Sequence, residues 1–326
     1  MKSVTMEHLE AYNREFNFDF FWDTIKDIDV TKNPDDFYKN ILEAIFKSNP
    51  LLREKHLDAN KEYERIKDDE EGIAQTFATY RVMFAIACWL EYRQIYKFDL
   101  DTLKLVSNSE FKDLTNEELK ALKMPYSTFI IENDFNYREE IIDTILVNKQ
   151  LVDNGDVVLM IYGFIKNGNS EKMLRLDLII EENKSINEFL NESVQDDCQE
   201  FIKKIMNLIM YLCQPKVEIL KKSVEKKEDT TNKKKIKHFY KVSYDSNEVG
   251  VTLGNAIRNY KYIYEKGDTL SNPDKKKGSI KKPHLRAGHF QGYWVGKGRN
   301  TLVPKYIEPI FVKGGASKIA TIHKVK

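Results

Sequence analysis

Imidazole, basic and aromatic side chains gather in one short stretch near the end of the chain. Arginine and lysine contact phosphates, aromatic rings stack on bases, and histidine exchanges protons near neutral pH. Seven of the fourteen glycines also fall between Gly278 and Gly315. Because glycine serves where the backbone needs positive φ or a close approach, the stretch is predicted to be a shaped surface rather than a spacer. Its candidate site residues are His284, Arg286, His289, Tyr293, Trp294, Lys297, Arg299 and Lys305.

The spacing of glycines and prolines predicts a β-hairpin in this stretch. Residues 293–295 form one arm, residues 296–300 the turn, and residues 302–312 the returning arm. Pro304 and Pro309 would bend the returning arm, because proline cannot donate to a strand ladder.

Metal and nucleotide binding fit the stretch poorly. His284 and His289 are five residues apart, which places them on opposite faces of a strand, and no Cys, Asp or Glu stands at ligand spacing. Gly296 and Gly298 are the first two glycines of a dinucleotide-binding motif, but the third is missing and a strand follows instead of a helix. We therefore expect neither a metal site nor a cofactor.

Two kinds of chemistry remain open for the candidate site residues. In the first, His284 and His289 act as acid and base in metal-independent RNA cleavage, and Arg286 stabilises the negative charge of the phosphorane. In the second, the four cations contact phosphates and the rings of Tyr293 and Trp294 stack on bases. Binding fits better than cleavage, so no catalytic residue is expected.

A structural role competes with binding for some of the aromatic residues. Phe290, Trp294 and Phe311 could form the core of a small domain, with the two histidines hydrogen-bonded to its backbone. For Trp294 and Phe311 this core role is the favoured interpretation, whereas Arg286 and the cations of the turn are favoured for contact with a partner.

Residues 281–315 resemble the closing motif of a type V-A anti-CRISPR family carried by phages and plasmids. The matching positions are Pro283, His284, Arg286, Gly288, His289, Tyr293, Trp294, Gly296, Pro309, Phe311 and Val312. The departures are Ala287 in place of a second Arg, Phe290 in place of Trp, Gln291 in place of a third His, and Tyr306 in place of Trp. A weaker similarity lies in the apolar run at 208–213, which precedes Gln214-Pro215.

The resemblance implies a non-catalytic adaptor that lowers expression of the CRISPR effector nuclease. Members of the family recognise the N-terminal segment of the effector as it emerges during translation, and the transcript is then lost. The expected partners are the nascent or N-terminal peptide of a type V-A effector, together with RNA or the ribosome, in the cytoplasm of a bacterial host. Two alternatives stay open: the metal-independent RNase, and an RNA-binding or interaction protein of a mobile element that is unrelated to CRISPR.

The composition is that of a soluble, intracellular protein. The chain of 326 residues is 41% hydrophobic and 32% charged, which is enough for a large core and about two domains. Cys88, Cys198 and Cys213 form no CxxC pair, and the pattern is typical of reduced, buried thiols. No N-terminal signal is visible, and no apolar run reaches the roughly 18 residues that span a bilayer. We therefore expect no contact with a membrane.

The net charge of +1 conceals two oppositely charged parts. Residues 1–215 carry 26 Lys and Arg against 41 Asp and Glu, a net charge of −15, whereas residues 216–326 carry 26 against 10, a net charge of +16. We predict an acidic body at 1–215, a basic linker at 216–237 and a basic C-terminal module at 238–326. The module would favour polyanions such as RNA, although many of its lysines could simply decorate linkers.

Periodicity predicts the α+β class: a mostly helical N-terminal lobe with a small antiparallel sheet, and a small, basic, β-rich C-terminal module. The predicted helices are 6–30, 37–46, 73–96, 185–191, 197–213 and 249–264. The predicted strands are 128–131, 157–165, 173–180 and 239–244, with an Asn-Gly turn at 166–170.

Three local predictions can be compared with the structure. Helix 73–96 is apolar nearly all round and should be buried, so Arg81 within it needs a carboxylate or carbonyl partner. Thr115 and Glu118 have the spacing of a capping box, and Ser185 should cap the next helix.

Overall fold

The structure is a computed structural model that describes residues 5, 7–9, 70–152, 155–166, 173–224, 244–268, 284–286, 288–299, 301–307 and 309–312. Of the predicted helix 6–30 only residues 7–9 are described, and these are helical. The predicted helix 37–46, most of the turn at 166–170 and the linker residues 225–237 lie outside the described residues.

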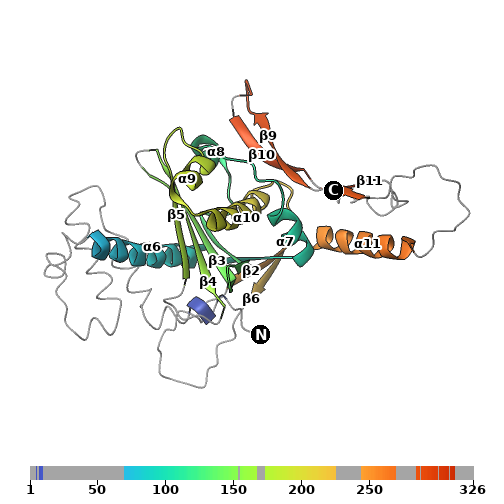
Figure 1. Ribbon diagram of the computed structural model, residues 1–326, viewed down its shortest axis with the longest axis horizontal. Coiled ribbons are helices and arrows are strands. Elements are labelled where there is room, and N and C mark those ends of the chain that lie inside the picture. Colours follow the sequence, from blue (N-terminus) through green and yellow to red (C-terminus); the bar gives the residue numbers. More distant parts are fainter. Residues whose placement is uncertain are drawn as a thin grey trace, which may run out of the picture.

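A seven-stranded mixed sheet is the centre of the protein (Figure 1). Its strand order is β5-β4-β3-β2-β1-β7-β6, in which β1 is parallel to both β2 and β7 and all other neighbours are antiparallel. The strands are β1 (Gln94–Phe98), β2 (Thr128–Tyr137), β3 (Glu140–Leu151), β4 (Val157–Ile165), β5 (Met173–Ile180), β6 (Ile219–Val224) and β7 (Tyr244–Val249).

The prediction of a small antiparallel sheet is therefore wrong in size and in topology. The predicted strands at 157–165 and 173–180 are confirmed as β4 and β5, but β1 and β3 were missed. Strand β3 is buried on both faces over residues 142–148, so its sequence lacks the polar–apolar alternation of a half-exposed strand. The parallel pairs could not be read from local pattern, because β1 and β7 lie about 150 residues apart in the chain.

One face of the sheet is covered by α6 (Glu70–Tyr92). The buried side chains of Met83, Ile86 and Trp89 pack with Ile130 and Leu146 of the sheet, as the apolar pattern predicted. The helix ends earlier than predicted, because Arg93 adopts positive φ (52°) and β1 begins one residue later.

Arg81 has the carboxylate partner that its place in an apolar helix required. Its Nη1 lies 2.9 Å from Oδ2 of Asp177 in β5, and the hydroxyl of Tyr162 donates to Oδ1 of the same carboxylate at 2.7 Å. Burial, and then the nearby Asp177 carboxylate, raise the pKa of Tyr162, so this ring stays a hydrogen-bond donor. The three side chains join α6 to β4 and β5.

Four helices cover the opposite face of the sheet (Figure 1). Both predicted caps are confirmed: Thr115 and Ser185 form capping boxes with Glu118 and Glu188. The helices are α7 (Leu100–Ser107), α8 (Asn116–Ala121), α9 (Ile186–Ser193) and α10 (Asp196–Leu212).

The remaining sheet strands and α11 (Val251–Asp268) come from the part of the chain predicted as linker and basic module. Residues 219–224, inside the predicted linker, form edge strand β6, whose Lys222 pairs with Glu248 of β7. Lysine on an edge strand discourages further pairing, so lysine content alone was a poor guide to a linker here. The predicted helix 249–264 is confirmed as α11, which packs on α7 through ion pairs of Arg258 with Asp99 and Asp101.

Four short strands follow: β8 (His284–Arg286), β9 (His289–Val295), β10 (Thr301–Ile307) and β11 (Ile310–Val312). They form two antiparallel two-stranded sheets, β9 with β10 and β8 with β11.

All three cysteines are free thiols. Across the described residues, no helix has the length and apolar character needed to cross a membrane.

Candidate nucleic-acid interface

The four C-terminal strands form two consecutive antiparallel ladders, which are together called the ribbon here and comprise the described residues from His284 to Val312. His289 pairs with Ile307 in one ladder and Arg286 with Ile310 in the other, so two residues separate the ladders on each arm. Because neither arm has an insertion, the register is the same in both ladders. The predicted hairpin is confirmed, but its first arm begins earlier than predicted, at His289, and the ladder of its returning arm ends earlier than predicted, at Ile307.

The two ladders are separated where Gly288 and Pro309 lie, whereas Pro304, the other proline predicted to bend the returning arm, pairs with Gly292 inside the ladder. Gly288 is buried, and a Cβ at this position would lie 2.1 Å from the hydroxyl oxygen of Tyr306. Only glycine leaves room for that ring. Gly288, one of the matching positions of the motif, therefore has a packing reason.

The base of the ribbon is anchored to the end of α10. The side-chain amide of Gln214 accepts a hydrogen bond from the backbone N–H of Tyr306 at 3.0 Å and donates to the carbonyl of Pro304 at 3.3 Å. The ring of Tyr306 meets that of Tyr211 edge to face at 5.1 Å, and Phe290 lies 5.0 Å from Tyr306. These contacts bring Phe290 and Tyr306 into the main core.

Sequence reasoning missed Gln214 as the residue that holds the ribbon. The available signal was its position directly after an apolar run, in the segment that weakly resembles the anti-CRISPR family. A polar residue at a helix end is more often a cap, so its contact with β10, 90 residues later, required the tertiary structure.

The free end of the ribbon is an exposed turn. Gly296, Gly298 and Arg299 have φ of 87°, 86° and 52°, and the Arg299 N–H donates to the Gly296 carbonyl at 3.0 Å. A Cβ at Gly298 would touch nothing within 4 Å, so this glycine serves its backbone conformation rather than close packing. The turn predicted from the glycine spacing is confirmed.

The two neighbouring aromatic residues near the turn lie on opposite faces of the ribbon, because side chains alternate along a strand. Trp294 shares the face of Phe290, Pro304 and Tyr306, which is anchored to the body; Tyr293 lies on the other face. Phe290 and Tyr306 are 7% and 6% exposed, but Trp294 is 59% exposed. The core role predicted for Trp294 is therefore wrong, since this ring lies beyond the contact with the body.

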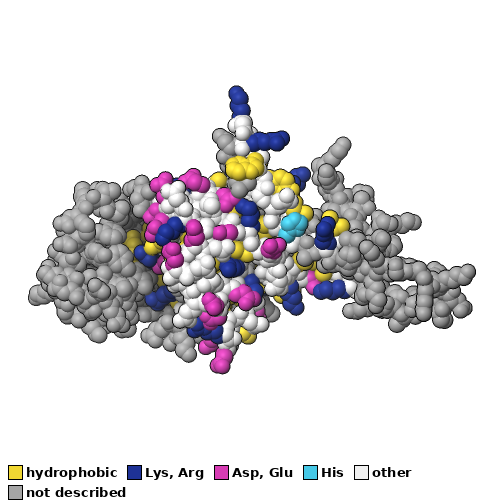
Figure 2. All heavy atoms as spheres, turned by 45° about the horizontal axis from the view of Figure 1, so that its top comes forward, with side chains coloured by type: hydrophobic (Ala, Val, Ile, Leu, Met, Phe, Trp, Pro, Cys, Tyr) yellow, Lys and Arg dark blue, Asp and Glu magenta, His cyan; other side chains and the backbone are white. Residues whose placement is uncertain are grey.

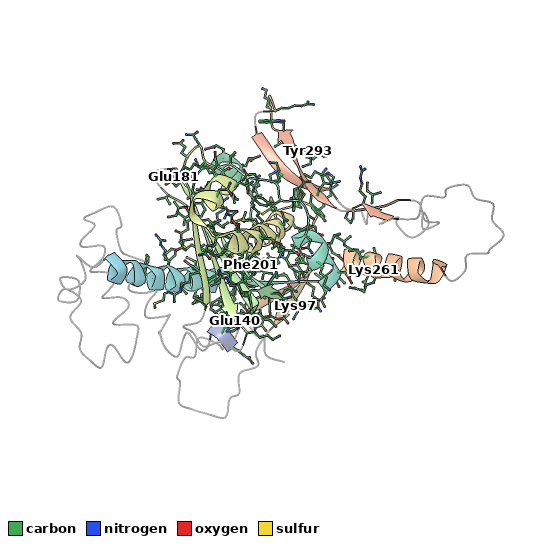
Figure 3. All side chains as sticks on the ribbon, in the orientation of Figure 1. Lys97, Glu140, Glu181, Phe201, Lys261 and Tyr293 are labelled. Carbon is green, nitrogen blue, oxygen red and sulfur yellow. The ribbon has the colours of Figure 1, made fainter. Side chains whose placement is uncertain are left out.

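Tyr293 has its own partners on the outer face. Lys305 Nζ lies 5.2 Å from the centre of the Tyr293 ring, a cation–π distance, and the Tyr293 hydroxyl donates to Gln291 Oε1 at 3.3 Å. Figure 3 labels Tyr293 on the ribbon, well away from Phe201 in α10. Tyr293 and Trp294, the two rings predicted to stack on bases, therefore do not share one surface of the ribbon.

The cations of the ribbon are exposed, and no described carboxylate pairs with them. Arg286, Lys297, Arg299 and Lys305 are exposed, and none forms an ion pair with another described residue. In Figure 2 dark blue Lys and Arg side chains stand at the end of the ribbon, while magenta carboxylates gather over the body. The unpaired cations leave the ribbon with a positive field that attracts anions.

The two histidines lie in different ladders of the ribbon. His289 is half-buried in β9 opposite Ile307, and His284 is in β8 opposite Val312, with a side chain outside the described residues. Among the described residues, no group of three or more His, Cys, Asp or Glu is arranged to hold a metal ion.

Strand β5 forms one edge of the main sheet, so its outer backbone groups pair with no other described strand. Its side chains are mostly half-exposed, and Ile179 is exposed. An edge strand of this kind can accept an extended peptide as an additional strand.

The fold and the ribbon define a mixed α/β protein in which a helix-covered sheet carries a projecting basic hairpin. The family model described as "AcrVA2-like: Anti-CRISPR type V subtype A2 family" matches residues 96–314, which is more than half of the chain. The chain therefore belongs to this anti-CRISPR family. The match begins within β1 and ends just beyond the ribbon.

A solved structure with a similar fold is described as the crystal structure of AcrVA2. It superposes with a TM-score of 0.59 at 18% identity, and the alignment covers 96% of this chain and 100% of that one. At this identity the likeness shows a shared fold. No curated protein sequence matches the chain.

Proposed function

We propose that the protein lowers expression of a type V-A CRISPR effector by recognising its nascent N-terminal peptide and causing loss of the mRNA. Family membership supports the anti-CRISPR role. In this proposal the protein is an adaptor in the host cytoplasm: the body binds the peptide, and the ribbon holds the ribosome or its RNA nearby.

The observation that carries the RNA or ribosome part is the charge of the ribbon. Its four cations face solvent without ion pairs to described residues, whereas body lysines such as Lys112 and Lys204 pair with carboxylates. Cations that are not neutralised internally can each replace a counterion on a phosphate backbone. The projecting turn gives them access to a large, flat partner (Figure 1).

The peptide would bind at the edge of β5 by strand addition. An edge strand offers backbone N–H and C=O groups to an extended peptide, and side chains of alternate residues supply specificity. The net charge of −15 over residues 1–215 would favour a basic peptide. Arg81, Tyr162 and Asp177 join β5 to α6 and β4, so these contacts hold the edge strand in place before a peptide binds.

Reporter transcripts can separate recognition of the peptide from recognition of the RNA. One reporter carries the effector's first codons recoded synonymously, which changes the RNA and keeps the peptide. A second carries the original codons shifted in frame, which keeps the RNA and changes the peptide. We expect loss of the first transcript and survival of the second, measured by quantitative PCR; the opposite pattern would exclude peptide recognition.

Ribosome association tests the ribbon. The variant Lys297→Glu/Arg299→Glu/Lys305→Glu should be recovered with ribosomes in much lower yield than the wild type. The matched control Lys104→Glu/Lys203→Glu/Lys221→Glu places the same charge change on α7, α10 and β6 and should be recovered normally. Equal recovery of all three proteins would exclude the ribbon as the contact.

A further inference from the structure

Trp294 is exposed in a way that packing does not explain. It lies on the anchored face of the ribbon, yet it is 59% exposed while its neighbours on that face, Phe290 and Tyr306, are almost fully buried. Exposure of a large indole costs hydrophobic free energy that the fold does not recover. A ring in this position is typical of a contact surface.

The surroundings of Trp294 determine which kind of partner would suit it. The turn directly after β9 places Lys297 and Arg299 close to it in the chain, both exposed and both without ion pairs to described residues. An aromatic ring flanked by free cations is complementary to a nucleotide, with its flat base and anionic phosphate. A hydrophobic protein partner would be poorly matched by these two charges.

We propose that Trp294 stacks on an unpaired base of single-stranded RNA, while Lys297 and Arg299 contact phosphates of the same strand. This inference rests on the proposed function and specifies the form of RNA that the ribbon binds. In a duplex the faces of the bases are covered by their neighbours, so an indole on a strand can reach only a base that is unstacked.

Tyr293 has a different role in this interpretation. It lies on the opposite face, so it cannot stack on the strand that covers Trp294. Its ring instead contacts Lys305 and its hydroxyl contacts Gln291, and both contacts restrict the side chains of the outer face. Tyr293 is therefore a positioning residue for Lys305, which contributes to phosphate attraction without stacking.

Binding of the full chain to two labelled RNAs tests the inference: a single-stranded oligouridine and a duplex of equal length, measured by fluorescence anisotropy. Trp294→Leu should weaken binding of the single strand about 5- to 100-fold and leave duplex binding unchanged. Trp294→Phe should keep most of the affinity, because the ring is retained. Tyr293→Leu should cause a small loss that is similar for both RNAs, since it acts through a charge.

Ile310 supplies the matched control, because it is another exposed apolar residue of the ribbon, 52% exposed, without an aromatic ring. Ile310→Ser should bind both RNAs as the wild type does. Since Trp294 and Ile310 are both exposed, neither substitution should prevent folding, and circular dichroism of each variant checks this.

The outcomes distinguish this inference from the proposed function. If the wild type binds both RNAs and Trp294→Leu binds the single strand normally, the stacking role is excluded while RNA binding by the ribbon stands. If the wild type binds neither RNA, the RNA part of the proposed function is itself excluded. If ribosome recovery then still depends on Trp294, the ring contacts a ribosomal protein, and single-stranded RNA is the wrong partner.

Discussion

Replacing Gln214 with alanine should loosen the ribbon from the body without unfolding the sheet. The side-chain amide of Gln214 is joined to β10 by two hydrogen bonds, one from the Tyr306 N–H and one to the Pro304 carbonyl. It also donates to the Met210 carbonyl at 2.7 Å, which fixes its orientation at the end of α10. Alanine removes all three contacts.

The size of the effect follows from the two bonds to the ribbon. Each contributes about 0.5–1.5 kcal/mol net, so their loss should weaken docking by about 1–3 kcal/mol. That range corresponds to about 5- to 150-fold in the equilibrium between docked and undocked ribbon. The contact of Tyr306 with Tyr211 is kept, so the docked state should remain the major one.

Hydrogen exchange at the Tyr306 amide is the appropriate measurement, because this N–H donates directly to Gln214 Oε1. In Gln214→Ala the Tyr306 amide, which also loses its acceptor, should exchange faster by at least the factor given above, while the amides of β3 and β4 stay unchanged. Gln199→Ala is the matched control. It also removes two side-chain bonds, to the carbonyls of Leu190 and Val194, but these lie far along the chain from the ribbon.

Unchanged exchange at Tyr306 in Gln214→Ala would refute the reasoning. It would mean that the hydrogen bond from the Tyr306 N–H to the Gln214 side chain does not hold the ribbon. Faster exchange of β3 and β4 would also count against it. In that case Gln214 would stabilise the whole sheet rather than the docking of one hairpin.

Three further predictions follow from other contacts. Gly288→Ala should destabilise the ribbon by about 1–3 kcal/mol because its methyl group would clash with the Tyr306 ring, and adding Tyr306→Leu should restore part of the loss; urea unfolding followed by near-UV circular dichroism measures both. The pKa of Asp101 is lowered, chiefly by the hydrogen bond from Lys261, so this pair stabilises the fold above the ordinary pKa of 3.8 and the contribution disappears as the pH falls through the lowered value. Asp101→Asn should therefore show a smaller loss of melting temperature between neutral and acidic pH than the wild type, and equal losses would contradict the assignment. Finally, RNA incubated with the protein in EDTA should remain intact on a gel; cleavage that disappears in His289→Ala would support the RNase instead of the adaptor.

The sequence by itself determined the features that depend on neighbouring residues. The capping box at Thr115 and Glu118 and the helix start at Ser185 were readable, because a cap needs only side chains three residues apart. The turn at 296–299 was readable for a similar reason: its glycines supply the positive φ that the turn requires. That Arg81 needs an oxygen partner such as a carboxylate also followed from the apolar pattern of its helix. Which carboxylate it contacts, Asp177, could not be predicted from the sequence.

The tertiary structure decided everything that depends on which distant segments meet. The parallel pairing of β1 with β7 joins residues about 150 positions apart, and no periodicity encodes such a register. The other edge of β7 made a strand of the lysine-rich residues 219–224, whose composition predicted a linker, because pairing with β7 satisfies their backbone groups. In the ribbon, strand alternation alone separates Tyr293 from Trp294, but only the contact of Gln214 and Tyr211 with β10 determines which face is buried and where that burial ends. Trp294 is left exposed because the body ends before the ribbon does, and that is a property of the assembled fold rather than of any local sequence.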